Sequence, residues 1–202
     1  VEKISRGEQI PAYNLIPAAT QNALPYQPDY ARLSQDERAD KARQLYAEAG
    51  YNAEHPLNIT LTYNTNDAHK TIAAAIAEMW QHTLGVKATP ENREWQAMLD
   101  SLKHGEVVMW RYGWQGDYND PYTFLEPLQS TAELNHVHFH NAEFDGKLQQ
   151  ANTTADLHER AQILHDAEKI LIDSFALAPI YHTSAIYVIK PSVKGYKANA
   201  LK

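Results

Sequence analysis

The sequence has no cysteine among its 202 residues. This absence excludes disulfide bonds, thiolate metal sites and cysteine nucleophiles, but it leaves the compartment open because large periplasmic proteins often have no disulfide. No window approaches the roughly twenty apolar residues that a membrane-spanning helix needs. Basic residues are also scarce, with 18 Lys and Arg against 25 Asp and Glu and a formal charge of −7. We therefore expect no nucleic-acid partner, whose phosphates would need a cationic surface.

The chain is long enough to bury a substantial core. It starts at Val1 and not at Met, and we expect it to be a piece of a longer protein. Its N-terminal region is rich in proline, which predicts an extended connector over residues 1–33. Residues 34–202 are then expected to form one α/β ligand-binding lobe.

The middle of the chain alternates helices with strands. Ser34 and Glu37 have the spacing of a capping box that opens a helix ending near Gly50. Apolar and polar residues alternate from Leu57 to Tyr63, as in a half-buried strand. A helix follows, and its apolar stripe predicts a buried core face with no ligand role: Ile72, Ile76, Met79, Trp80 and Leu84.

A second strand is expected at residues 86–93, although Pro90 weakens it. A helix ending at Gly105 and a third strand at residues 107–112 complete a β-α-β-α-β order. This order predicts an α/β fold with a mixed sheet, in which the strands of the β-α-β-α-β core are parallel and flanked by helices. Ligands are then expected at the carboxyl ends of these strands.

The last third of the chain is expected to be mainly helical. A helical segment begins at Asn141, and a longer amphipathic helix covers residues 155–173. The apolar stripe of the longer helix contains Leu157, Ala161, Leu164 and Leu171. Strand-like runs follow at residues 178–181 and 185–189.

The most informative stretch runs from Trp110 to Pro121 and reads WRYGWQGDYNDP. Gly113 and Gly116 allow a close approach to another backbone, so this open edge can accept an added strand. Asp117 follows among aromatic residues (Tyr112, Trp114 and Tyr118), which would lower the local dielectric and favour a cation. Arg111 is available for an anion, so the pattern suits a zwitterion such as an amino acid or peptide. The alternative is a turn with helix-capping acids before Pro121 and an Arg111 salt bridge.

Two histidine features are candidate sites. His69 follows Asn66-Asp67, which has the pattern of a helix cap, so a solvated first-turn histidine is the alternative to a ligand contact. In a strand, His136, His138 and His140 would lie on one face and form a zinc or nickel site. No fourth ligand accompanies them, and chance clustering on a polar loop is the better interpretation. We assign no metal and no cofactor.

Three separated stretches carry a resemblance to a known family. They are YNTNDAHK from Tyr63 to Lys70, GWQGDYNDP from Gly113 to Pro121, and APIY from Ala178 with the following IKP and KGY. In this order they resemble the oligopeptide-binding and murein-peptide-binding proteins of bacterial ABC importers. The resemblance implies the C-terminal lobe of a two-lobed protein with the fold of type II periplasmic binding proteins.

The resemblance also implies roles for residues that match its motifs. Asp117 resembles the aspartate that pairs with the peptide α-ammonium group, and the backbone from Gly113 to Gln115 resembles the segment that pairs with the ligand as an added strand. Trp114 resembles a pocket wall. Arg111 and His69 match positions that meet a ligand carboxylate. The chain departs from the family at Leu102, where some members have a basic residue, so peptide length and murein specificity stay open.

The resemblance further implies partners and a compartment. The partners are short peptides, an N-terminal lobe of the same protein and a membrane permease. We expect a monomer in the periplasm, or one at the outer face of the cytoplasmic membrane if it is lipid-anchored. The alternatives are a lobe for a metal or another small solute, and a hydrolase that uses Asp117, Asp120 and His69. Because no motif of a hydrolase accompanies these residues, we expect no enzymatic activity.

Overall fold

The computed structural model describes residues 9–183 and 188–196. The chain divides into two compact units. Residues 29–113 form the sheet unit, whereas residues 9–28 and the described residues from 114 onward form the helical unit. The predicted connector over residues 1–33 and single lobe over 34–202 stay predictions.

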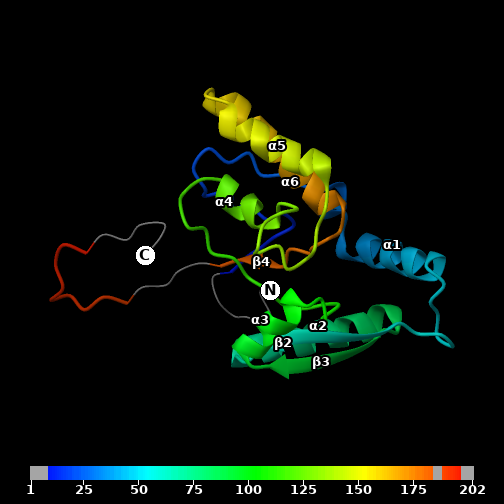
Figure 1. Ribbon diagram of the computed structural model, residues 1–202. Coiled ribbons are helices and arrows are strands. Elements are labelled where there is room, and N and C mark those ends of the chain that lie inside the picture. Colours follow the sequence, from blue (N-terminus) through cyan, green and yellow to red (C-terminus); the bar gives the residue numbers. More distant parts are fainter. Residues whose placement is uncertain (1–8, 184–187, 197–202) are drawn as a thin grey trace. The chain divides into compact units, whose positions relative to one another are not determined.

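The sheet unit is built on two parallel strands, β2 (Asn58–Asn64) and β3 (Lys87–Arg93), which pair from Asn58 opposite Lys87 to Asn64 opposite Arg93. The connecting helix α2 (Asp67–Leu84) packs against both strands (Figure 1). A 3-10 turn η1 (Asp29–Arg32) and helix α1 (Gln35–Glu48) precede the strands, and α3 (Trp95–Lys103) follows them. The predicted α/β class is confirmed, with β3 formed in spite of Pro90.

Local sequence signals set the ends of these helices. The Ser34 hydroxyl accepts the Glu37 amide N–H at 3.3 Å, and the Glu37 carboxylate accepts the Ser34 amide N–H at 2.7 Å, so the predicted capping box is present. The Asn66 side chain accepts amide N–H groups from Ala68 and His69 at the start of α2. Gly85 ends α2 with a φ of 78°, a conformation that favours glycine.

The predicted third strand at residues 107–112 is wrong in extent. The structure has a single parallel bridge there, between Trp110 and Thr62 of β2. Two hydrogen bonds define it, from the Thr62 N–H to the Met109 carbonyl (3.0 Å) and from the Arg111 N–H to the Thr62 carbonyl (2.8 Å). The chain is irregular from Arg111 to Gly116, so the pairing with β2 stops after this one bridge. Because Thr62 also pairs with Glu91, β2 lies between β3 and this bridge, and Thr62 is buried.

The predicted core face of α2 is wrong in its members. None of the five predicted residues is buried: Met79 is 51% exposed and the other four are half-buried. The buried residues of this helix are Ala73 and Ala77. Because a helix turns by about 100° per residue, Met79 points well away from the face of these two alanines.

The helical unit consists of α4 (Tyr122–Leu125), the 3-10 turn η2 (Glu126–Leu128), α5 (Ala142–Thr153) and α6 (Leu157–Asp173). Helices α5 and α6 lie side by side (Figure 1). Most of the core comes from them, and its buried members are Ile16, Tyr122, Leu125, Phe139, Phe144, Leu148, Ala151, Ile163, Leu164, Ala167 and Leu171. The predicted stripe of α6 is confirmed except at its first position, because Leu157 is 61% exposed in the first turn.

The proline-rich segment of the helical unit is irregular, as expected, but it does not lie wholly on the surface. Ile16 is 1% exposed and belongs to the core. Strand β1 (Ile10–Pro11) pairs antiparallel with β4 (Tyr181–His182). The expected strand at residues 178–181 is thus displaced by a few residues. Most of the strand expected at residues 185–189 lies outside the described residues.

Candidate functional site

The residues proposed for ligand binding fall in both units. His69, Arg111 and Gly113 belong to the sheet unit, whereas Trp114, Gln115 and Asp117 belong to the helical unit. The backbone from Arg111 to Gly116 has no regular secondary structure, and Gly113 and Gln115 are exposed. Each part of the candidate site can therefore be assessed within its own unit.

In the helical unit, Thr123 of α4 holds the loop from Trp114 to Asp117. Its hydroxyl accepts the Asp117 amide N–H at 3.0 Å, and its carbonyl accepts the Trp114 indole N–H at 2.9 Å. Gly116 lies so close that a Cβ atom added there would be 2.9 Å from Thr123 Cγ2 and 3.0 Å from the Phe124 ring. The second glycine of the motif is thus required for a close approach.

The carboxylate of Asp117 is exposed, so the expectation that aromatic rings would shield it is wrong in this chain. Tyr118 is 40% exposed, and its hydroxyl donates to the Glu126 carboxylate at 2.8 Å. Burial, together with Glu126, raises the pKa of the Tyr118 phenol above its ordinary value. The Tyr118 side chain is thus bound to Glu126, and Asp117 stays open to solvent.

The other acid of the motif, Asp120, has a structural partner. The Arg160 guanidinium donates to both of its carboxylate oxygens, at 2.7 and 2.9 Å, and both side chains are mostly buried. Asp120 also accepts the Tyr122 amide N–H at 2.9 Å. The alternative of a structural acid before α4 is therefore correct for Asp120, although the N-cap residue is Pro121 and not Asp120. Both oxygens of the Asp120 carboxylate are engaged in these contacts.

In the sheet unit, the His69 imidazole lies near the Arg111 guanidinium. His69 is half-buried in the first turn of α2, and burial together with the nearby Arg111 charge lowers its pKa. The Arg111 guanidinium lies against Gly113: a Cβ atom added at this glycine would be 3.3 Å from Arg111 Nη2. These groups can meet an anion. Leu102, the point of departure from the family pattern, is buried in the core with Met98 and Val107.

The three histidines after Asn135 do not lie on one face of a strand. The segment turns instead, with His138 at a φ of 51°, and the Asn135 side chain bonds to both backbone groups of Phe139. Phe139 is buried and forms an edge contact with Phe144. In the part of the chain that the structure describes, no group of three or more His, Cys, Asp or Glu side chains has the arrangement of a metal site.

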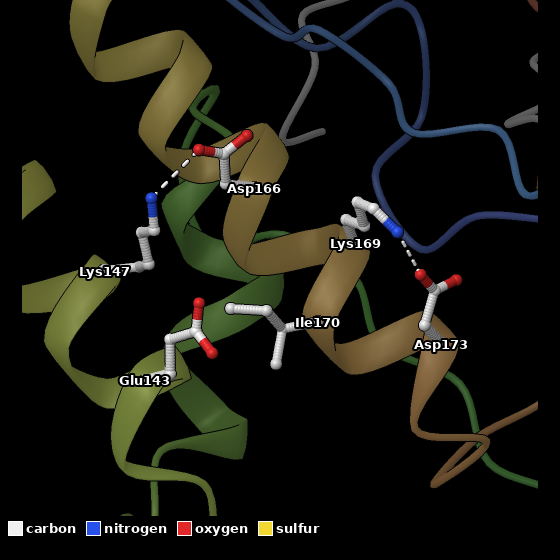
Figure 2. Close-up of a pocket in the computed structure, with 6 residues that line it drawn as sticks. All are labelled: Glu143, Lys147, Asp166, Lys169, Ile170 and Asp173. Carbon is white, nitrogen blue, oxygen red and sulfur yellow. Dashed lines mark hydrogen bonds and ion pairs between the residues drawn. The ribbon is translucent and has the colours of Figure 1, made fainter.

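A polar pocket of about 380 Å³ lies over α5 and α6 and contains none of the predicted site residues (Figure 2). Its lining is Glu143, Lys147, Asp166, Lys169, Ile170 and Asp173. Both lysines are already paired, Lys147 with Asp166 at 2.9 Å and Lys169 with Asp173. The pocket therefore offers no unpaired cation and is not the candidate site.

Sequence reasoning missed three residues that organise the helical unit: Thr123, Arg160 and Glu168. Glu168 is 0% exposed and accepts amide N–H groups from Leu15, Ile16 and Tyr26 at 2.6–2.9 Å. A signal was present, because Glu168 stands on the apolar face of α6 with Leu164 and Leu171.

Among the described residues, no helix is both long and apolar enough to span a membrane.

Comparison with known proteins identifies the family. The model for the bacterial extracellular solute-binding proteins, family 5 (middle), matches residues 1–136. The chain is 38% identical over 198 residues to the periplasmic murein peptide-binding protein MppA of Escherichia coli, covering 98% of the chain and 37% of MppA. It is 36% identical over 196 residues to the periplasmic oligopeptide-binding protein OppA of Salmonella typhimurium, covering 97% of the chain and 36% of OppA.

A solved structure gives the same result. The structure of Haemophilus influenzae OppA in complex with the peptide RPPGFSPFR superposes with a TM-score of 0.81 at 31% identity, over 86% of the chain and 34% of that protein. The chain thus spans little more than a third of the relatives it matches. The fold, the matched motifs and these similarities establish that the chain belongs to the bacterial extracellular solute-binding proteins of family 5.

Proposed function

We propose that the intact protein is the solute-binding component of an ABC peptide importer and that it binds short peptides by their α-ammonium group and backbone. Family membership supports a binding protein, and the peptide-binding relatives MppA and OppA support a peptide ligand. The observation that carries the proposal is the loop from Trp114 to Asp117. Gln115 and Asp117 are exposed there, and Thr123 holds the loop through hydrogen bonds with Trp114 and Asp117.

In the proposed complex, the Asp117 carboxylate pairs with the peptide α-ammonium. The backbone from Gly113 to Gln115 hydrogen-bonds to the peptide main chain as an added strand. Each such bond contributes roughly 0.5–1.5 kcal/mol irrespective of the peptide side chains. Trp114 forms a pocket wall. Because most contacts involve main chain, the protein would accept many peptide sequences.

At the other end of the peptide, Arg111 and His69 meet a carboxylate, either directly or through water. Burial and, after it, the nearby Arg111 charge lower the pKa of His69 in the free protein. A bound carboxylate would reverse that effect and raise the pKa of His69.

The remaining parts of the proposal concern the whole protein. An N-terminal lobe would close over the peptide, and a membrane permease would receive it. The protein would act as a monomer in the periplasm, or at the outer face of the cytoplasmic membrane if it is lipid-anchored. It would release its peptide unchanged, so peptide recovered after incubation should be intact.

The test compares free and N-acetylated peptides in the intact protein. Calorimetry with alanine peptides from dialanine to penta-alanine should show that Asp117→Asn weakens the unmodified peptides more than tenfold, which corresponds to about 1.4 kcal/mol or more. N-acetyl peptides should bind poorly to both forms. Glu133→Gln, which changes another exposed acid of the helical unit, is the control and should bind like wild type. Equal affinity for free and acetylated peptides contradicts the proposal.

A further inference from the structure

Thr123 is a polar residue whose side chain is fully buried. It is 0% exposed and lies in the short helix α4, directly after the motif that ends at Pro121. Buried hydroxyl groups are retained where they satisfy a partner, because an unpaired one is costly. The partner of this hydroxyl belongs to the candidate ligand-binding loop.

Three different atoms of Thr123 contact three of the four residues in the loop. The hydroxyl oxygen accepts the Asp117 amide N–H, the carbonyl oxygen accepts the Trp114 indole N–H, and the methyl group closes against Gly116. The main chain at Asp117 and the ring of Trp114 are thus tied to one buried residue. Neither group can shift without breaking a hydrogen bond.

The chain after the loop is fixed independently. Asp120 is held by two hydrogen bonds from Arg160 and accepts the Tyr122 amide N–H. The Asn119 side chain accepts the Gln21 amide N–H at 2.9 Å. By contrast, the Asp117 carboxylate makes no hydrogen bond to any residue that the structure describes. The backbone is therefore held while the carboxylate stays available, which is the condition for a preorganised contact.

We propose that Thr123 is the positioning residue of the ligand-binding loop and that its hydroxyl fixes the direction in which the Asp117 carboxylate meets the peptide ammonium. This inference rests on the proposed function. It adds a determinant of specificity for free N-termini that lies behind the binding surface and does not touch the ligand.

The direct test replaces the hydroxyl without changing the shape of the side chain. Thr123→Val keeps the methyl group and the carbonyl but cannot accept the Asp117 N–H, whereas Thr123→Ser keeps the hydroxyl. In the intact protein, Thr123→Val should weaken the tightest-binding unmodified alanine peptide about tenfold, the scale of one lost hydrogen bond. The affinity for its N-acetyl form should change little. The ratio of the two affinities should be retained in Thr123→Ser and in the control Thr131→Val, which changes an exposed threonine of the same unit.

A merely structural role would lower the melting temperature without changing this ratio. The second variant, Gly116→Ala, leaves Thr123 intact but pushes the loop away from it, so it should reduce the ratio as well. If Thr123→Val does not fold, Gly116→Ala decides the matter. The Asp117 amide should also exchange its hydrogen faster in Thr123→Val.

Each outcome either supports or overturns the proposal. A reduced ratio in Thr123→Val that Thr123→Ser restores supports the proposal. An unchanged ratio in Thr123→Val or Gly116→Ala overturns it, as does an equal loss in the Val and Ser variants. If wild type binds no peptide of the series, or if Asp117→Asn binds as well as wild type, the proposed function fails and the role of Thr123 in peptide binding fails with it. Peptide binding with normal Asp117 dependence but no Thr123 effect overturns the positioning role alone.

Discussion

The carboxylate of Glu168 should be a main determinant of the stability of the helical unit. It is fully buried, and it accepts three amide N–H groups from the proline-rich segment: Leu15 at 2.9 Å, Ile16 at 2.6 Å and Tyr26 at 2.8 Å. Glu168→Ala would remove both acceptor oxygens and leave one buried and two partly buried amides without this partner. Each unpaired group costs about 1–3 kcal/mol, and because such costs are not additive we expect a loss of about 3–5 kcal/mol.

Glu168→Gln should be less severe. The amides of Leu15 and Ile16 share one carboxylate oxygen, which the glutamine oxygen can replace, whereas the glutamine NH₂ group would then face the Tyr26 N–H. One lost bond predicts a loss of about 1–3 kcal/mol. The free energy of unfolding is measured by urea denaturation followed by circular dichroism. The exposed Glu159→Gln on the same helix is the control and should stay within about 0.5 kcal/mol of wild type.

The stability contribution of Glu168 should depend on pH. Burial raises its pKa above the ordinary value of 4.5, although the three amides oppose this shift. The folded state therefore binds the proton more tightly than the unfolded state. The extra stability from this tighter proton binding is fully present below pH 4.5 and is lost as the pH rises through the folded-state pKa. The difference in stability between wild type and Glu168→Gln should therefore narrow in that window. A Glu168→Ala variant within about 1 kcal/mol of wild type would refute the reasoning.

Two further predictions concern the candidate site and the acid next to it. Arg160→Met leaves the mostly buried carboxylate of Asp120 without its two charged hydrogen bonds. It should lower the free energy of unfolding by about 3–5 kcal/mol, measured by urea denaturation. A loss as small as that of the exposed control Arg43→Met would contradict this prediction. Adding peptide should raise the pKa of His69 in an NMR titration, so affinity should fall as the pH rises through the bound-state pKa. A C-terminally amidated peptide should remove this pH dependence, and its persistence would exclude the carboxylate contact.

Much of the sheet unit was predictable because its signals are local. The cap at Ser34, the alternation through Leu61 and Tyr63 and the helix ending at Gly85 depend on residues close in sequence. The third strand was not predictable in extent, because its pairing depends on where the chain leaves β2 after Trp110. Met79 was expected in the core because the stripe followed the larger apolar residues, whereas the buried residues of α2 are Ala73 and Ala77.

The candidate site was predicted only in part. The motif identified Asp117 as its central acid, but composition suggested a shielded carboxylate and the structure has an exposed one. Composition also did not distinguish Asp120, whose partner Arg160 is 40 residues away in sequence. Thr123 was missed because a buried threonine has no signature until the loop packs on it.

The most direct measurement is a crystal structure of the intact protein with a bound unmodified peptide. We expect the peptide α-ammonium nitrogen at hydrogen-bond distance from the Asp117 carboxylate, about 2.7–2.9 Å. We also expect main-chain hydrogen bonds between the peptide and the segment from Gly113 to Gln115. An ammonium group held by another residue, with Asp117 still exposed to solvent, would contradict the central claim.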